Sequence, residues 1–158
     1  MNMTGNDQDN PGVITIPPLI YIAFFLIGLG LNYLWPVSVL PDRAQYAAGG
    51  LLIVVSAIIA GITIPKFRMA HTGFYAFKPT TSLITDGPFR FSRNPTYLAL
   101  GLLYIGIGIA LDCLWIIGML IPLLAVMHYG VIRREERYLE RKFGDEYLRY
   151  RASVRRWL

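Results

Sequence analysis

The stretch GPFRFSRNPTY, residues 87–97, separates two strongly apolar halves of the chain. Pro95 suits the first turn of a helix, because its missing N–H removes a donor that would have no partner at that position. No charged residue follows between Tyr97 and Leu111. The helix that begins here is therefore expected to run directly into the hydrocarbon of a membrane.

Three polar side chains of this stretch, Arg90, Arg93 and Asn94, would lie at the mouth of that helix. The first turn of a helix also leaves backbone N–H groups without partners. This combination suits an anionic or zwitterionic ligand. A basic loop that only marks the cytoplasmic face of a membrane protein is the alternative interpretation.

The composition favours a small polytopic membrane protein with a single domain, residues 1–158. Of the 158 residues, 54% are hydrophobic and 13% aromatic, and the mean hydropathy of +0.45 is high for a soluble domain of this size. The net charge of +5 is uneven, because nine of the 15 Lys and Arg residues follow Gly130. A basic tail beside membrane spans favours membrane lipids as partners over nucleic acid. The single cysteine, Cys113, allows no internal disulfide, and no His or carboxylate spacing predicts a metal site.

The distribution of apolar residues predicts an all-α fold: a helical membrane bundle with about four transmembrane helices. Two uncharged runs precede the polar stretch, one from Pro17 to Trp35 and one that ends at Pro65, and two shorter runs follow it. Asp112 is placed to cap the fourth helix. We therefore divide the chain into a disordered N-terminus (1–12), two transmembrane helices (13–64), a cytoplasmic loop with the candidate ligand site (65–96), a transmembrane hairpin (97–130) and a cytoplasmic helical tail (131–158).

The basic residues also predict the orientation in the membrane. The loop 65–96 carries five Lys or Arg residues and the tail nine, whereas the two other loops hold only Arg43. The positive-inside rule then places the loop, the tail and both termini in the cytoplasm, in what we expect to be a bacterial inner membrane. The loop and the tail would share one membrane face, so that a composite site between them is possible.

The tail has a helical periodicity that includes an acidic residue. Ile132, Glu136, Leu139 and Phe143 follow i, i+4, i+7, i+11 spacing, and Glu135 lies about 100° away on the same helix. A carboxylate on a buried face needs a cation or hydrogen-bond donors. The first alternative is local pairing with an arginine one turn back, Arg133. The second is that Glu136 turns toward the Arg93 loop and binds a ligand.

The tail ends in a second cluster of aromatic and basic residues. Gly144 is expected to break the helix, and Asp145 can start another. The closing Arg155-Arg156-Trp157 has the composition of an interfacial membrane anchor.

Several separated motifs together resemble the isoprenylcysteine carboxyl methyltransferase superfamily, whose core phosphatidylethanolamine N-methyltransferases share. The resemblance covers about residues 66–158 and implies an integral-membrane methyltransferase that binds S-adenosyl-L-methionine without a Rossmann domain. The motifs that carry it are Gly87-Pro88-Phe89-Arg90, Ser92-Arg93-Asn94-Pro95-Thr96-Tyr97, Glu135-Glu136, Leu139, Phe143-Gly144, Tyr147, Tyr150 and Val154-Arg155-Arg156-Trp157.

The resemblance also implies roles for individual residues. Arg93 and Glu136 would be catalytic, and Glu135 and Glu136 would hold polar groups of the cofactor. Asn94 stands where the isoprenylcysteine enzymes typically have His, which puts a prenyl-cysteine substrate in doubt, because Asn does not titrate near neutral pH. The residues implied to bind the cofactor are Arg90, Arg93, Asn94, Pro95, Tyr97, Gly101, Glu135 and Glu136.

The expected activity is methyl transfer from S-adenosylmethionine to a lipophilic or membrane-associated acceptor. The acceptor group could be a carboxylate, a thiol or an amine, and the sequence does not choose among them or fix the oligomeric state. Two alternatives have different signatures. A nicotinamide-dependent lipid reductase on a related core would bind NADPH, and a non-catalytic membrane subunit would tolerate alanine at Arg93, Tyr97 and Glu136.

Overall fold

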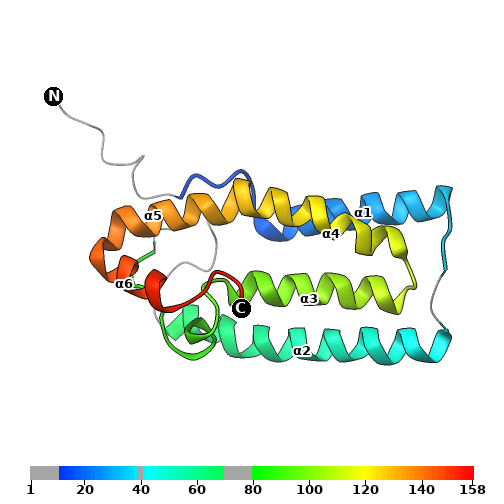
Figure 1. Ribbon diagram of the computed structural model, residues 1–158, viewed down its shortest axis with the longest axis horizontal. Coiled ribbons are helices and arrows are strands. Elements are labelled where there is room, and N and C mark those ends of the chain that lie inside the picture. Colours follow the sequence, from blue (N-terminus) through cyan, green and yellow to red (C-terminus); the bar gives the residue numbers. More distant parts are fainter. Residues whose placement is uncertain (1–10, 39–40, 70–79) are drawn as a thin grey trace.

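The computed structural model describes residues 11–38, 41–69 and 80–158, and these residues form helices without any strand. Of the N-terminus that we expect to be disordered, 1–12, residues 1–10 lie outside this part of the chain, as do Lys78 and His71 of the loop. Gly12 is described, and its carbonyl oxygen accepts a hydrogen bond from Arg134 Nη1 at 2.7 Å. Figure 1 shows the arrangement of the elements. They are α1 (Pro17–Leu34), α2 (Asp42–Met69), the 3₁₀ turn η1 (Gly87–Arg90), α3 (Pro95–Ala110), α4 (Leu114–Met127), the π turn η2 (His128–Ile132), α5 (Arg133–Phe143) and α6 (Asp145–Ser153).

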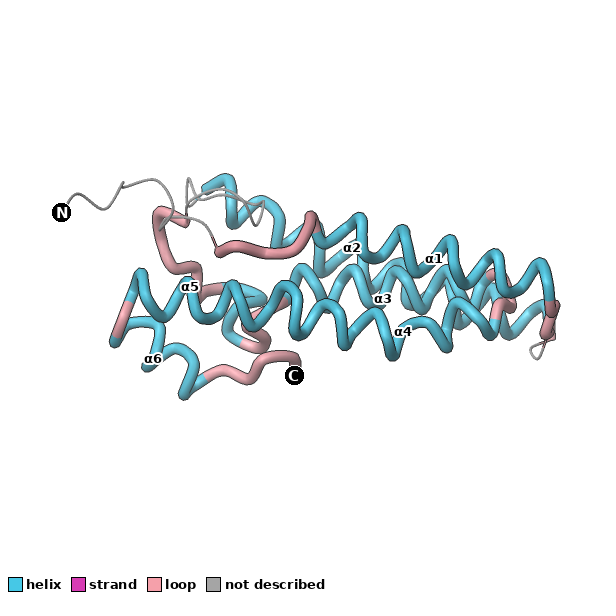
Figure 2. The backbone as a smooth tube through the Cα atoms, turned by 90° about the horizontal axis from the view of Figure 1, so that it is seen from above, coloured by secondary structure: helices cyan, strands magenta, loops and turns pink. Residues whose placement is uncertain are grey.

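The first four long helices form one elongated bundle, in which α2 packs mainly on α3 and α1 on α4 (Figures 1 and 2). Three helical segments are long and apolar enough to cross a membrane, namely Pro17–Leu34, Arg43–Phe67 and Leu114–Phe143, and α3 is a shorter apolar helix. The predicted helical membrane bundle is therefore confirmed. The start of α3, α5, α6 and the C-terminus gather at one end of the bundle (Figure 1).

Two helix boundaries differ from those expected. Helix α2 does not end at Pro65 but continues to Met69, because tertiary contacts hold its last turn. Lys66 pairs with Asp86, and the Phe67 ring meets the edge of Phe89 with 5.7 Å between centroids. These contacts offset the one backbone hydrogen bond that a proline removes.

The turn between α3 and α4 also differs from the prediction. The N-cap residue of α4 is Cys113, which makes no side-chain capping bond, so Asp112 is not the cap. Asp112 instead takes a positive φ of 46°, a conformation that Asp tolerates better than most residues and that reverses the chain here.

Small residues allow α2 and α3 to approach each other closely. A Cβ added to Gly49 would lie 2.7 Å from the Gly106 carbonyl oxygen and from Ala110, and one added to Gly106 would lie 2.9 Å from Ile53. Such contacts are a main source of helix association in lipid, where apolar surface gains nothing by leaving hydrocarbon. They fix the position of α3 and of the residues at its start.

One buried hydrogen bond joins the same two helices. The Ser56 hydroxyl donates to the Ala99 carbonyl oxygen at 2.7 Å, and Ser56 is buried. We expect Ser56→Ala to lower the free energy of unfolding by about 1 kcal/mol, measured by thermal unfolding in detergent. Thr63→Val is the matched control, because the Thr63 hydroxyl bonds only to Ile59 of its own helix. Equal losses in the two variants would contradict a specific interhelical role for Ser56.

Candidate functional site

The loop before α3 is built around a buried phenylalanine. Gly87, with φ of 62°, begins the turn η1 and is followed by Pro88, and η1 places Phe89 against Tyr147 and Tyr150 of α6. The Tyr150 hydroxyl donates to the Phe89 carbonyl oxygen at 2.8 Å. Helix α6 thus holds one side of the loop by burial and by a hydrogen bond.

The C-terminal segment, residues 154–158, holds the other side of the loop. The Arg93 backbone N–H donates to the Arg155 carbonyl oxygen at 3.0 Å. The Arg156 carbonyl oxygen accepts from the Ser92 hydroxyl at 3.2 Å and from Asn94 Nδ2 at 2.9 Å. Residues 92–94 are therefore fixed by backbone groups more than 60 positions later in the chain.

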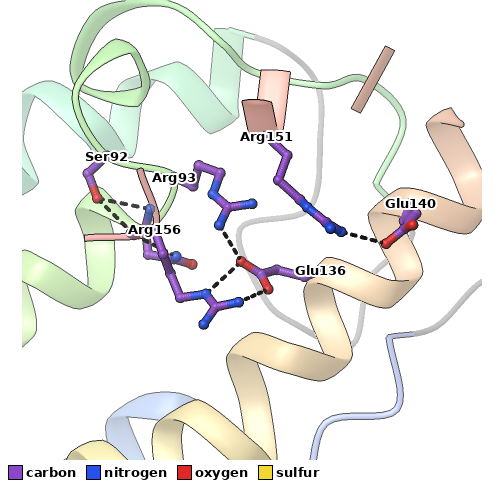
Figure 3. Close-up of polar contacts among 7 residues, drawn as sticks. Ser92, Arg93, Glu136, Glu140, Arg151 and Arg156 are labelled. Carbon is purple, nitrogen blue, oxygen red and sulfur yellow. Dashed lines mark hydrogen bonds and ion pairs between the residues drawn. The ribbon is translucent and has the colours of Figure 1, made fainter. Parts of the chain in front are cut away.

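Glu136 lies at the centre of an ion-pair cluster (Figure 3). Arg156 donates from Nε to Oε1 at 2.9 Å and from Nη2 to Oε2 at 2.7 Å, and Arg93 Nη2 lies 3.2 Å from Oε1. These hydrogen bonds to Glu136 raise the pKa of the Arg156 guanidinium above its ordinary value. The Glu136 and Arg93 side chains are only 13% and 10% exposed. Glu136 therefore turns toward the Arg93 loop, whereas Arg133, its alternative partner, lies over the Tyr129 ring.

This cluster gives Arg156 a role that the interpretation of the closing residues as a membrane anchor did not include. The Arg156 side chain pairs with Glu136, and its carbonyl oxygen accepts a hydrogen bond from Asn94 of the loop. Composition alone does not separate the two cases, because both need an arginine beside aromatic residues.

Glu135 also points inward, toward α3. Its Oε1 accepts a hydrogen bond from the Tyr97 hydroxyl at 2.7 Å, and no cation pairs with it among the described residues. The helical periodicity predicted that Glu136 alone points inward. The hydrogen bond from Tyr97 shows that Glu135 points inward as well. The π turn η2 takes up one extra residue and sets α5 back by about 100° relative to a regular continuation of α4. As a result, Glu135 lies on the same face of the helix as Leu123 and Met127, which are buried in the bundle.

Two polar groups of this region are buried and lack hydrogen-bond partners among the described residues. They are the Arg93 guanidinium, at Nε and Nη1, and the Thr96 hydroxyl oxygen, in the first turn of α3. The Arg93 guanidinium lies beside the Tyr147 hydroxyl without forming a well-oriented bond through these two nitrogens. Because buried polar groups normally have partners, these groups mark a place where a ligand would gain hydrogen bonds.

The other predicted residues have different positions. Asn94 is committed to the Arg156 carbonyl oxygen, Pro95 is buried at the start of α3, and Arg90 is exposed at the end of η1, outside the ion-pair cluster. A Cβ added to Gly101 would meet nothing within 4 Å, so space is open one turn beyond Tyr97. The structure thus brings Arg93, Tyr97, Glu135 and Glu136 together. Sequence reasoning missed the roles of Ser92 and Arg156, and the short polar spacing Ser-x-Asn was the only signal for the former.

Comparisons with known proteins cover most of this region. A family model described as phospholipid methyltransferase matches residues 44–146, from the start of α2 to the start of α6. The chain is 55% identical over 42 residues to an uncharacterized protein of Haemophilus influenzae, which is 27% of this chain and 65% of that protein. It is 31% identical over 103 residues to the nickel-cobalt-cadmium resistance protein NccN of Alcaligenes xylosoxydans xylosoxydans, which is 60% of this chain and 48% of that protein.

The chain therefore spans less than two thirds of the length of these relatives. No solved structure matches it significantly. The family model covers more than half of the chain and includes Arg93, Tyr97, Glu135 and Glu136. Together with the membrane-spanning helices, this match confirms the resemblance seen in the sequence, and the chain belongs to the phospholipid methyltransferase family.

Proposed function

We propose that the protein is an S-adenosyl-L-methionine-dependent methyltransferase that acts on a lipophilic or membrane-associated acceptor. The observation that carries the proposal is unused bonding capacity at two charged side chains, Arg93 and Glu135, the latter being the residue before the ion-pair partner of Arg93, Glu136. Among the described residues, Arg93 has two nitrogens without acceptors, and the Glu135 carboxylate has a tyrosine hydroxyl as its one partner. Family membership supports the same cofactor, because phospholipid methyltransferases generally use S-adenosylmethionine.

The charge distribution suits a zwitterionic ligand. Two arginines share Glu136, so one positive charge remains at Arg93, while no ion pair involves Glu135 within the part of the chain that the structure describes. A carboxylate on Arg93 and a cation near Glu135 would satisfy both, and hydrogen bonds to charged groups contribute about 1.5–3 kcal/mol each. The methionine end of S-adenosylmethionine carries a carboxylate, an ammonium group and a sulfonium, which is the pattern that these two residues require.

The cofactor would supply an electrophilic methyl group on its sulfonium. Residues at the start of α3 would orient it, since Tyr97 is fixed through Glu135 and Arg93 through the C-terminal segment. Catalysis would then come mainly from holding the acceptor in line and excluding water. A carboxylate or thiolate acceptor would need no base, whereas an amine would have to release a proton first. The open space beside Gly101, on an apolar helix, suits an acceptor that arrives from the bilayer.

We also propose that this end of the bundle faces the cytoplasm of a bacterial inner membrane. Residues 65–96, which include the last turn of α2, and the tail, residues 131–158, carry 14 of the 15 Lys and Arg residues, five and nine respectively. A water-soluble cofactor would reach Arg93 and Glu135 from that side. Cysteine labelling at an exposed tail residue, Arg149→Cys, should occur only after the membrane is permeabilised.

The proposed function is tested by calorimetric titration of the purified protein with S-adenosylmethionine, its demethylated product and NADPH. We expect the first two ligands to bind below millimolar concentration and NADPH not to bind. Transfer of a labelled methyl group to a membrane lipid extract should accompany this binding. Binding of NADPH alone would favour the reductase, and binding of none of the three would overturn the proposal.

A further inference from the structure

The ion-pair cluster contains two arginines that compete for one carboxylate. Arg156 makes two parallel hydrogen bonds and occupies both oxygens of Glu136, whereas Arg93 reaches only Oε1, through Nη2 at 3.2 Å. The longer and single contact belongs to the arginine that keeps two nitrogens without acceptors. The two arginines therefore share the Glu136 carboxylate unequally, and Arg93 forms the weaker contact with it (Figure 3).

Without Arg156, Glu136 would pair differently with Arg93. A carboxylate and a guanidinium prefer the two-bond geometry, which is their strongest form of contact. Because Glu136 and Arg93 are both about nine-tenths buried, water could not replace the lost bonds of Arg156 efficiently. Glu136 would then form the two-bond pair with Arg93 and take up a second nitrogen of that guanidinium.

We propose that Arg156 is a positioning residue that holds Glu136 away from full pairing with Arg93, so that Arg93 stays free to bind a carboxylate of the ligand. The inference rests on the proposed function, since the carboxylate is that of S-adenosylmethionine. It assigns to a residue outside the matched family segment, 44–146, the control of a residue inside it.

The backbone of the same segment supports this role. The carbonyl oxygen of Arg155 accepts from the Arg93 N–H, and that of Arg156 accepts from Ser92 and Asn94 on either side. The segment therefore fixes the main chain that carries Arg93 while the Arg156 side chain fixes its competitor, Glu136. Arg155 and Arg156 together therefore hold the Arg93 backbone and the carboxylate that its guanidinium contacts.

The test compares Arg156→Ala with the control Arg151→Ala. Arg151 links α6 to α5 through an ion pair with Glu140 at 3.0 Å. Both side chains are more than 40% exposed and lie outside the ion-pair cluster around Glu136. Calorimetry is run with S-adenosylmethionine and with its decarboxylated analogue, which lacks the carboxylate. We expect Arg156→Ala to weaken binding of S-adenosylmethionine by about tenfold or more and binding of the analogue by less than about threefold. Arg151→Ala should change neither.

A double variant distinguishes positioning from general support. In Glu136→Gln/Arg156→Ala, the side chain at 136 no longer carries the charge that captures Arg93, so the double variant should bind S-adenosylmethionine more tightly than Arg156→Ala does. A merely structural role for Arg156 predicts instead that the double variant binds S-adenosylmethionine no more tightly than Arg156→Ala. Arg156→Lys keeps the charge but not the two-bond geometry, and it should show an intermediate and still carboxylate-selective loss.

The outcomes separate the two proposals. If the wild type binds neither S-adenosylmethionine nor its demethylated product, the proposed function falls and this inference falls with it. If the wild type binds but Arg156→Ala loses both ligands equally, or if the double variant binds no more tightly than Arg156→Ala, only the role of Arg156 is overturned. Should Arg156→Ala fail to fold in detergent, the same criteria apply to Arg156→Lys.

Discussion

Replacing Glu135 by alanine should lower kcat/KM for S-adenosylmethionine by between about tenfold and about 100-fold, the equivalent of one hydrogen bond to a charged group. The variant loses the counter-charge that we assign to the cationic part of the cofactor, and it leaves the Tyr97 hydroxyl without its acceptor. The measurement is transfer of a labelled methyl group to a membrane lipid extract, with thermal unfolding in parallel.

Two further variants show what the measurement means. Glu140→Ala removes a carboxylate from the same helix, but one that is exposed and pairs only with Arg151 at the surface, so activity should be unchanged. Glu135→Gln keeps the size of the side chain and an acceptor for Tyr97 but removes the charge. Full activity in Glu135→Gln would rule out an electrostatic role for Glu135.

The second large effect concerns the packing that places α3. Gly49→Leu should destabilise the bundle by about 3 kcal/mol or more, or prevent folding, because even a Cβ at this position would lie 2.7 Å from backbone atoms of α3. A drop in unfolding temperature and a loss of monodisperse protein in detergent would show it.

The neighbouring glycine is the control for Gly49. A Cβ on Gly50 would meet nothing within 4 Å, so Gly50→Leu should be neutral or slightly stabilising through its helix propensity. Equal instability of both variants would mean that α2 tolerates no side chain here for reasons other than its contact with α3.

The membrane bundle was predictable because hydrocarbon imposes a simple rule on sequence. Every span needs a long apolar run with internally satisfied backbone groups, and these runs are visible in residues 17–35 and 114–130. Two helix ends differed from the prediction, one because of tertiary contacts and one because of a π turn. Lys66 and Phe67 carry α2 past Pro65, and the π turn η2 joins α4 to α5 in one continuous helix.

The candidate site was predictable only in part. Arg93, Tyr97 and the two glutamates could be singled out by motif and periodicity, and the structure brings them together. The rotation of α5 was hidden, because a π turn has no reliable sequence signature and moves the next residues by about 100°. The partnership of Arg156 with Glu136 was hidden as well, since nothing local to residue 156 distinguishes an ion pair across the fold from a lipid contact.

The bonds from Arg155 and Arg156 back to residues 92–94 have a consequence for biosynthesis. The partners of Ser92 and Asn94 lie 64 and 62 positions later in the chain. Synthesis proceeds from the N-terminus, so residues 92–94 are made before the residues that bond to them. The loop that carries Arg93 therefore cannot form these hydrogen bonds before residue 156 has been synthesised.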